Sequence, residues 1–250
     1  MGVKLHITQE DLPKEFKQYQ LIKSTDGISQ TVYFLDNLYV VKIFHHNNIS
    51  SLQNEINLLN SLEDLKVSKP INKIFYIKKY PSLIYPKAKG KSLTISTKES
   101  LEQIGKFLSK LHSKTKNRNI SNIKLYETER LYKLIIKTKN QEFLDNFNNI
   151  DIDLKHDGII HGDLFMDNCT FDNGHLEIVY DFCEACVGDF IFDLAVVAIS
   201  WCKNDEDIQI LLEAYGYSST IEHFAKYCNY AQLYYNTTRF LNNTEYVKYN

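Results

Sequence analysis

Three polar side chains within residues 159–182 carry the chemistry that the sequence predicts most directly: Asp163, Asn168 and Asp181. Carboxylate and amide oxygens are suited to orienting a hydroxyl nucleophile and to holding magnesium against nucleotide phosphates, the two tasks of phosphoryl transfer. Because magnesium keeps several of its waters, one or two protein ligands and the phosphates are enough to bind it. We expect Asn168 and Asp181 to be these ligands, which leaves Asp163 to orient the hydroxyl.

The interval between the first two of these residues is that of a known catalytic loop. Asp163 precedes Asn168 by five positions, as in the kinase loop H-R-D-x-x-x-x-N, where the aspartate accepts the proton of the substrate hydroxyl and the asparagine binds metal. Gly162 stands here where that loop has arginine. We interpret His161, the first residue of the motif, as a support of the loop rather than a general acid, and Asp163 as the catalytic residue.

A β-hairpin is predicted just before Asp181. Residues 169–171 have the composition of a short strand, an Asn-Gly pair favoured in two-residue turns follows at 173–174, and apolar residues alternate at 176–180. The second strand would therefore return the chain to the loop and bring the Asp181 carboxylate beside Asp163.

Three motifs follow one another in the order HGDLFMDN, VYDF and GDFIFDLA. In this order they resemble the aminoglycoside phosphotransferase and choline kinase superfamily of small-molecule kinases. Within it, DLFMDN, the run 181–186, FDLAVVAISWC and the opening MGVKLHITQEDLP look most like type II homoserine kinases. The resemblance implies an α+β, protein-kinase-like two-lobe fold, with a small antiparallel-sheet lobe at 1–86 that binds nucleotide and a mostly helical lobe at 87–250 for catalysis and acceptor binding. It also implies that ATP and Mg2+ are bound.

The first lobe contains a lysine and a glutamate at positions typical of these kinases. Strand patterns at 31–35 and 39–44 predict a hairpin whose second strand contains Lys42, and apolar residues at helical spacing predict a helix at 49–62 that contains Glu55. The resemblance implies that Lys42 contacts the α and β phosphates and pairs with Glu55. The alternatives are a solvent-facing lysine on an edge strand and an exposed helix charge.

Less distinctive residues are assigned to the remaining contacts with the nucleotide. The segment 24–30 stands where a glycine-rich phosphate loop belongs, although it has one glycine and lacks the GxGxxG pattern. By the resemblance, we expect Gly27 and Ser29 to approach the phosphates. Tyr85 and Ala88, in a segment that resembles the kinase hinge after a predicted strand, are expected to meet the adenine.

Polar residues of the second lobe are expected to support its helices. Ser96 and Glu99 are predicted to form a capping box that opens an amphipathic helix. Asp193 is expected either to cap the apolar helix predicted at 194–201 or, as the resemblance implies, to brace the catalytic loop. Asp189 is a second candidate, and we interpret both as structural.

Three hypotheses remain for the acceptor. Homoserine is expected from the subgroup resemblance, an aminoglycoside or a choline- or ethanolamine-like alcohol is the alternative, and an inactive nucleotide-binding pseudokinase is the third. Homoserine is a zwitterion, so its pocket needs a cation for the carboxylate and an acidic or carbonyl group for the ammonium. Arg239 and Lys203 are the candidate cations. A polycationic aminoglycoside would instead need several carboxylates, for which Glu184 and the cluster 205–207 are candidates.

Composition and charge describe an ordinary globular chain. Its 250 residues are 44% hydrophobic and 24% charged, enough for a sizeable core, and its formal net charge of −2 argues against a nucleic-acid partner. The sequence shows no run of about eighteen apolar residues and no signal-peptide pattern. We therefore expect a cytoplasmic enzyme without a membrane partner, a monomer or homodimer that acts on ATP and a small-molecule hydroxyl substrate. Its five cysteines, an odd number, are expected to be reduced thiols.

Overall fold

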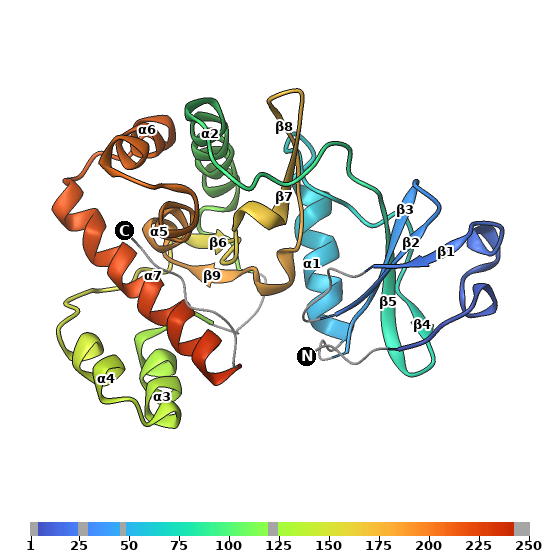
Figure 1. The fold of residues 1–250 in the computed structure, drawn as a ribbon, viewed down its shortest axis with the longest axis horizontal. Coiled ribbons are helices and arrows are strands. Elements are labelled where there is room, and N and C mark those ends of the chain that lie inside the picture. Colours follow the sequence, from blue (N-terminus) through green and yellow to red (C-terminus); the bar gives the residue numbers. More distant parts are fainter. Residues whose placement is uncertain (1–4, 25–29, 46–48, 120–124, 243–250) are drawn as a thin grey trace. The chain divides into compact units, whose positions relative to one another are not determined.

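The computed structural model describes residues 5–24, 30–45, 49–119 and 125–242. Contacts within the chain divide it into two compact units, a smaller one of residues 1–63 and 67–89 and a larger one of residues 64–66 and 90–250. The smaller unit contains an antiparallel sheet and the larger one most of the helices, which confirms the predicted α+β class (Figure 1).

The described part of the smaller unit is built on a five-stranded antiparallel sheet in the order β1-β2-β3-β5-β4. The strands are β1 (Leu21–Lys23), β2 (Thr31–Leu35), β3 (Tyr39–Ile43), β4 (Phe75–Ile77) and β5 (Tyr80–Pro86). Buried and partly exposed side chains alternate along β2, because successive residues of a strand point to opposite faces of the sheet. Tyr33, Leu35 and Val41 enter the core from β2 and β3. The predicted hairpin of β2 and β3 is confirmed, and β3 lies in the interior of the sheet.

Helix α1 (Ile49–Ser61) follows the sheet hairpin and ends one residue before its predicted end. Leu52, Leu58 and Leu59 are buried on one side of it, as expected for an amphipathic helix. Glu55 lies among these residues in the sequence and is also buried. The helix therefore holds a carboxylate close to an apolar stripe.

Within the described residues, six helices make up most of the larger unit. They are α2 (Lys98–Thr115), α3 (Thr128–Thr138), α4 (Gln141–Asn148), α5 (Phe190–Trp201), α6 (Asp205–Tyr215) and α7 (Ile221–Leu241). Helix α5 is apolar on all sides and almost entirely buried, which is the pattern of a central helix. It packs against α7, while α2 packs against α6 (Figure 1).

Among the described residues of the larger unit, two short antiparallel pairs of strands accompany the helices. They are β6 (Gly158–Ile160) with β9 (Cys186–Gly188), and β7 (Cys169–Asp172) with β8 (His175–Val179). The second pair is the predicted hairpin. Its turn residues Asn173 and Gly174 have φ of 49° and 77°, and positive φ at both central residues is the mark of a type I′ turn.

The predicted start of α2 is wrong by one residue. Thr97 is the N-cap, because its hydroxyl accepts from the backbone N–H of Ser100 at 3.3 Å while the Ser100 hydroxyl oxygen accepts from the N–H of Thr97 at 2.8 Å. Ser96 instead donates its hydroxyl to the carbonyl of Trp201 at 2.6 Å. This tertiary contact withdraws Ser96 from capping and shifts the box, so that Ser100 rather than Glu99 is its second member.

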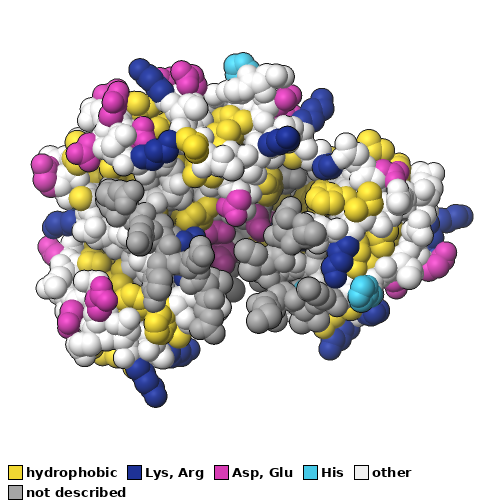
Figure 2. All heavy atoms as spheres, viewed as in Figure 1, with side chains coloured by type: hydrophobic (Ala, Val, Ile, Leu, Met, Phe, Trp, Pro, Cys, Tyr) yellow, Lys and Arg dark blue, Asp and Glu magenta, His cyan; other side chains and the backbone are white. Residues whose placement is uncertain are grey.

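The surface carries mixed charge. On the face drawn in Figure 2, basic side chains are scattered among acidic ones over the coloured part of the surface and do not form a continuous patch. Among the helices of the described residues, none combines the length and the apolar composition needed to cross a bilayer. All five cysteines are thiols.

Ile104 and Ile136 form a matched pair for measuring how much the helical core stabilises the larger unit. Ile104 on α2 is fully buried, whereas Ile136 on α3 is 49% exposed. We expect Ile104→Ala to lower the free energy of unfolding by about 2–5 kcal/mol, because it removes buried methyl groups and leaves a cavity. Ile136→Ala should change that free energy by less than about 0.5 kcal/mol. Urea unfolding followed by the fluorescence of Trp201 measures both, and equal losses would contradict the burial assigned to α2.

Candidate active site

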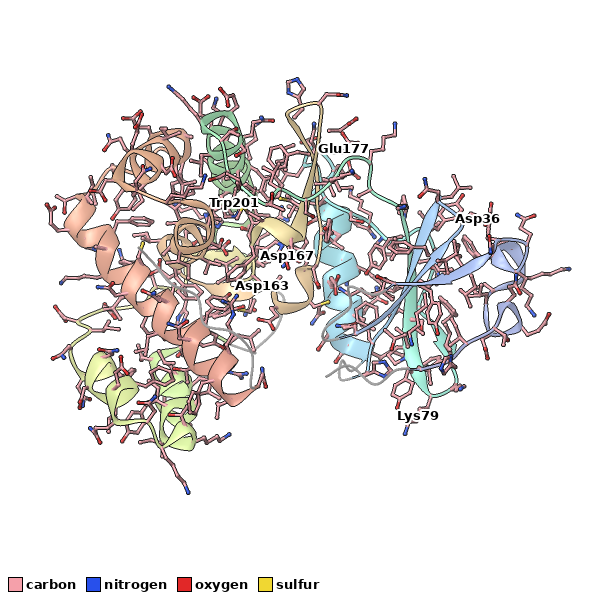
Figure 3. The ribbon with its side chains drawn as sticks, viewed as in Figure 1. Asp36, Lys79, Asp163, Asp167, Glu177 and Trp201 are labelled. Carbon is pink, nitrogen blue, oxygen red and sulfur yellow. The ribbon has the colours of Figure 1, made fainter. Side chains whose placement is uncertain are left out.

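The loop between β6 and β7 carries Asp163 (Figure 3) and is held together by its own hydrogen bonds. The side chain of Asn168 donates from Nδ2 to the carbonyl of Asp163 at 2.6 Å and to its Oδ2 at 3.1 Å. The N–H of Phe165 donates to the same carbonyl at 2.9 Å, and the N–H of Asn168 donates to the carbonyl of Phe165 at 3.0 Å. Because Nδ2 faces Asp163, Oδ1 is the atom of the Asn168 amide that can act as a metal ligand.

Asp181 reaches this loop at the end of the hairpin. The N–H of Tyr180 donates to the carbonyl of Asn168 at 3.0 Å, so the end of β8 is attached to the loop. Asp181 follows with φ of 66°, an uncommon conformation for a residue with a side chain, and opens the short 3-10 helix Phe182–Glu184. Asp163, Asn168 and Asp181 are thereby brought together, as the hairpin prediction required.

The carboxyl group of Asp163 has an unusual proton affinity. Burial, followed by the nearby carboxylates of Glu184, Asp181 and Asp167, raises the pKa of Asp163 to about 8, while the hydrogen bond from Asn168 acts in the opposite direction. A pKa close to the working pH suits a general base. Sequence reasoning missed Asp167, although it stands inside the motif next to Asn168; Figure 3 shows it on the same loop as Asp163.

His161 is buried, its ring packs against that of Phe182, and both of its ring nitrogens are hydrogen-bonded to backbone groups of the loop and of Tyr180. Its Nε2 donates to the carbonyl of Tyr180 at 3.1 Å, and its Nδ1 accepts from the N–H of Asp163 at 3.2 Å. Burial lowers the pKa of His161, although the charge of Asp193 acts to raise it. A neutral imidazole that links β8 to the loop is a support, which agrees with the interpretation of this residue from the sequence.

Asp193, fully buried on α5, holds the backbone of the loop in place through hydrogen bonds. It accepts from the backbone N–H groups of His161 at 2.9 Å and Gly162 at 2.8 Å, and from Nε2 of His112 at 3.0 Å. Burial alone would raise the pKa of Asp193, but these partners hold it below its ordinary value. Capping of α5 falls to Asp189, whose carboxylate accepts from the N–H groups of Ile191 and Phe192 in the first turn of the helix. The two roles left open for these aspartates are thus divided between them.

Gly162 replaces the arginine of the kinase motif for a steric reason. Its φ is 80°, and a Cβ atom at this position would lie 2.5 Å from the ring of Tyr126. The hydroxyl of Tyr235 donates to the Gly162 carbonyl. Two tyrosines from separate segments therefore contact the residue before Asp163, and a side chain there would collide with Tyr126.

Two charged side chains from outside the loop, Glu184 and Arg239, also lie next to it. The carboxylate of Glu184 accepts from the hydroxyl of Tyr126 at 2.8 Å. The guanidinium of Arg239 lies over the ring of Phe165, 5.2 Å from its centre, and its charge interacts with that of Asp163. The sequence pattern around Tyr126 predicts no part in chemistry, because only the folded chain brings it to the loop.

The other charged residues considered for acceptor binding, Lys203 and the cluster 205–207, lie just before α6 or in its first turn. Lys203 donates from Nζ to the carbonyl of Ser96 at 3.4 Å and from its N–H to Asp207 at 2.9 Å. Asp207 and the other carboxylates of the cluster 205–207 occupy the first turn of α6, where negative charge is stabilised by the helix dipole. Their positions have a structural explanation.

The predicted nucleotide residues lie in the smaller unit. Lys42 on β3 is paired with Val32 of β2 and Leu83 of β5, and Glu55 on α1 is only 6% exposed. The two alternatives for them, an edge-strand lysine and an exposed helix charge, are therefore wrong.

The residues predicted to contact the adenine lie on β5 or just after it, whereas the two residues predicted to contact the phosphates are not among those that the structure describes. Tyr85 lies on β5 opposite Val40, and Ala88 follows the end of that strand. Gly27 and Ser29 lie outside the described residues. Among the described residues, no group of three or more His, Cys, Asp or Glu side chains could hold a metal ion. Asn168 and Asp181 suit instead a magnesium ion that phosphates and waters complete.

Comparison with known proteins adds independent information. A model of the phosphotransferase enzyme family (APH) matches residues 21–228. Homoserine kinases of Methylobacillus flagellatus and Janthinobacterium sp. (strain Marseille) are 25% and 26% identical to the chain, over 82% and 86% of it and 72% and 78% of those proteins. Wild-type aminoglycoside 2′-phosphotransferase-IIIa with GDP has a TM-score of 0.69 over 90% of this chain and 88% of that one, at 15% identity. ADP-bound aminoglycoside phosphotransferase APH(2″)-Ib has a TM-score of 0.59 over 92% and 90%, at 19% identity. These likenesses confirm the protein-kinase-like fold.

Gly162→Ala tests the packing of the loop against Tyr126, with Gly174→Ala as its control. Gly174 has a similar φ of 77°, but a Cβ there meets no described atom within 4 Å. We expect Gly174→Ala to lower the free energy of unfolding by about 1–2 kcal/mol through backbone strain alone. Gly162→Ala should lower it by clearly more, because the methyl group also collides with Tyr126. Urea unfolding of both variants measures the difference, and equal losses would show that the collision is relieved at no cost.

Asp163→Asn tests the raised pKa of this carboxyl through the pH dependence of stability. Between about pH 4 and pH 8 the folded protein keeps a proton on Asp163 that the unfolded chain has lost, so this residue makes the free energy of unfolding fall as the pH rises. Asp163→Asn should remove that contribution and flatten the profile from pH 5 to pH 8. Urea unfolding across this range measures it, and Asp172→Asn, at the exposed hairpin turn, should keep the original slope. A profile unchanged by Asp163→Asn would disprove the shift.

Proposed function

The chain belongs to the phosphotransferase enzyme family, and from this premise we propose that it transfers the γ-phosphate of ATP to the hydroxyl group of homoserine. Its family and its relatives among homoserine and aminoglycoside kinases make it an enzyme that phosphorylates alcohol groups of small molecules. The observation that carries homoserine as the acceptor is the similarity to homoserine kinases, which extends over more than four fifths of the chain.

In the proposed reaction Asp163 binds the acceptor hydroxyl and receives its proton. The hydroxyl oxygen forms the new bond to the γ-phosphorus, the bond from that phosphorus to the bridging oxygen of ADP breaks, and the hydroxyl proton passes to the carboxylate of Asp163. Asp163 acts in its ionised form, and its raised pKa makes that carboxylate a stronger base than an ordinary aspartate. The hydrogen bonds of Asn168 keep its side chain and backbone in one orientation toward the acceptor.

Asn168 and Asp181 are the residues that would hold Mg2+. Their oxygen donors, one amide and one carboxylate, suit a hard cation that keeps most of its coordination for phosphates and water. Magnesium held by these two residues would supply positive charge that offsets the negative charge developing on the phosphates. The αL backbone of Asp181 orients its carboxylate at the end of β8.

Nucleotide binding is assigned to the lobe at 1–86, and acceptor binding to the lobe at 87–250. Lys42 would contact the α and β phosphates and Glu55 would hold Lys42 in position, while the backbone at Tyr85 and Ala88 would meet the adenine. The burial of Glu55 and the interior position of β3 support these roles, because a buried carboxylate requires a charged or hydrogen-bonding partner. ADP in a relative of the same fold supports ATP as the phosphate donor.

A coupled assay of ADP release separates the candidate acceptors. The purified protein would be supplied with ATP, magnesium and in turn homoserine, choline, ethanolamine and an aminoglycoside, and turnover should be greatest with homoserine. Higher turnover with an aminoglycoside or an amino alcohol would replace homoserine as the acceptor. No turnover with any of them, together with no binding of ATP, would contradict the kinase assignment and favour an inactive pseudokinase.

Asp163→Asn should separate catalysis from nucleotide binding. We expect kcat for homoserine to fall by about 10²–10⁴-fold, the usual contribution of general acid–base catalysis, while the Kd for ATP with magnesium changes by less than about threefold. ADP release and calorimetric titration with ATP measure the two effects, and Asp172→Asn should alter neither. A parallel loss of ATP binding would mean that Asp163 serves the metal or the fold instead of the acceptor.

A further inference from the structure

Helix α7 presents an arginine to the catalytic loop in a fixed position. Arg239 follows Tyr235 by four residues, so the two side chains share one face of the helix. The Tyr235 hydroxyl is bonded to the carbonyl of Gly162, and its ring meets that of Phe165 at 4.8 Å, edge to face. The Arg239 guanidinium covers the same Phe165 ring. Helix α7 therefore holds a cation beside the residue that lies two positions after Asp163.

The surroundings of Arg239 suit the binding of a carboxylate. Burial lowers the pKa of its guanidinium, while the charges of Asp163 and Asp167 act to raise it, so the cation is partly withdrawn from water and close to the reacting end of the loop. A guanidinium stacked on an aromatic ring loses little further entropy on binding. Its planar pair of donors matches the two oxygens of a carboxylate.

The carboxylate of Glu184 is connected to the loop through Tyr126, which packs against Gly162, the residue before Asp163. Glu184 stands three residues after Asp181 and is exposed, but its Oε2 is tied to the hydroxyl of Tyr126. Tyr126 is itself buried, and its ring packs against Gly162. The Tyr126 hydroxyl thereby fixes a negative charge close to the catalytic aspartate, since the same Glu184 carboxylate contributes to the raised pKa of Asp163.

We propose that Arg239 and Glu184 are the two ends of an acceptor site for a zwitterionic amino acid, with Arg239 binding the α-carboxylate, Glu184 binding the α-ammonium and Asp163 binding the side-chain hydroxyl. Tyr126 and Tyr235 are positioning residues, because each connects the loop to one of the two charges. This assignment rests on the proposed transfer of phosphate to homoserine and names the residues that select it.

The same pair of charges rejects the other candidate acceptors. A polycationic aminoglycoside would bring positive charge against Arg239, and like charges at close range cost binding free energy. Choline and ethanolamine have no carboxylate and would therefore form no charge pair with the guanidinium of Arg239. Only an acceptor with both charges satisfies both ends of the site.

Variants and truncated acceptors together test the assignment. L-homoserine would be compared with 3-aminopropan-1-ol, which lacks the carboxylate, and with 4-hydroxybutanoate, which lacks the ammonium. We expect Arg239→Met to lower kcat/KM for homoserine by about 30-fold or more, mainly through KM, because a partner of a desolvated charge pair is lost. It should leave kcat/KM for 3-aminopropan-1-ol nearly unchanged. Glu184→Gln should lower kcat/KM for homoserine and spare 4-hydroxybutanoate.

Matched controls distinguish recognition from structural damage. Lys203→Met removes a cation that contacts Ser96 and should leave all three acceptors unaffected. Arg239→Lys keeps the charge without the planar pair of donors and should recover part of the loss. An equal fall of kcat/KM for homoserine and 3-aminopropan-1-ol in Arg239→Met would show that the arginine only supports the loop, and no fall for either would exclude it from the site; both results overturn the proposal.

Binding measured without turnover separates this proposal from the proposed function. Calorimetric titration of the unaltered protein with homoserine, in the presence of ADP and magnesium, should detect binding that Arg239→Met and Glu184→Gln each weaken. Binding without phosphorylation would count against the kinase reaction and leave the site standing. Phosphorylation of homoserine with discrimination unaltered in both variants would leave the reaction standing and overturn the site, as would the absence of homoserine binding.

Discussion

The site depends on the hydrogen bonds that the buried carboxylate of Asp193 accepts. A charge buried this completely must be neutralised by hydrogen bonds, and its partners are the N–H groups of His161 and Gly162 and the imidazole of His112. These bonds join α5, the most apolar helix of the larger unit, to the loop and to α2. The backbone just before Asp163 therefore has one position, set by the core rather than by the loop itself.

A loop held in this way can keep groups that would otherwise move apart. Burial, together with the nearby carboxylates of Glu184, Asp181 and Asp167, raises the pKa of Asp163, and the loop holds these groups close to one another despite their repulsion. The αL conformation of Asp181 and the positive φ of Gly162 are likewise maintained by the hydrogen bonds and rings around them. The packing of α5, α2 and α7 thus maintains this arrangement of like charges, which suits the proposed phosphoryl transfer.

Sequence patterns predicted the parts of this arrangement that depend on neighbouring residues. The hairpin of β7 and β8 followed from an Asn-Gly turn between alternating strands, and α1 ended within one residue of its predicted end. The predicted capping box of α2 was wrong because the hydroxyl of Ser96 is used by Trp201, more than one hundred residues away. The contributions of Tyr126 and Tyr235 could not be predicted either, since nothing near them in the sequence distinguishes a packed tyrosine from one that touches a catalytic loop.

The sequence by itself determined which chemical groups are present and in what local order: an aspartate five positions before an asparagine, a hairpin that returns a second aspartate, and the family to which these motifs belong. Spacing along the chain and turn chemistry act over a few residues, and so they can be read without the fold. Only the tertiary structure decided that Asp193 braces the loop while Asp189 caps α5, that glycine is required at position 162, and that Arg239 rather than Lys203 lies at Asp163. These outcomes depend on burial and on contacts between distant segments, which appear only when the helices pack.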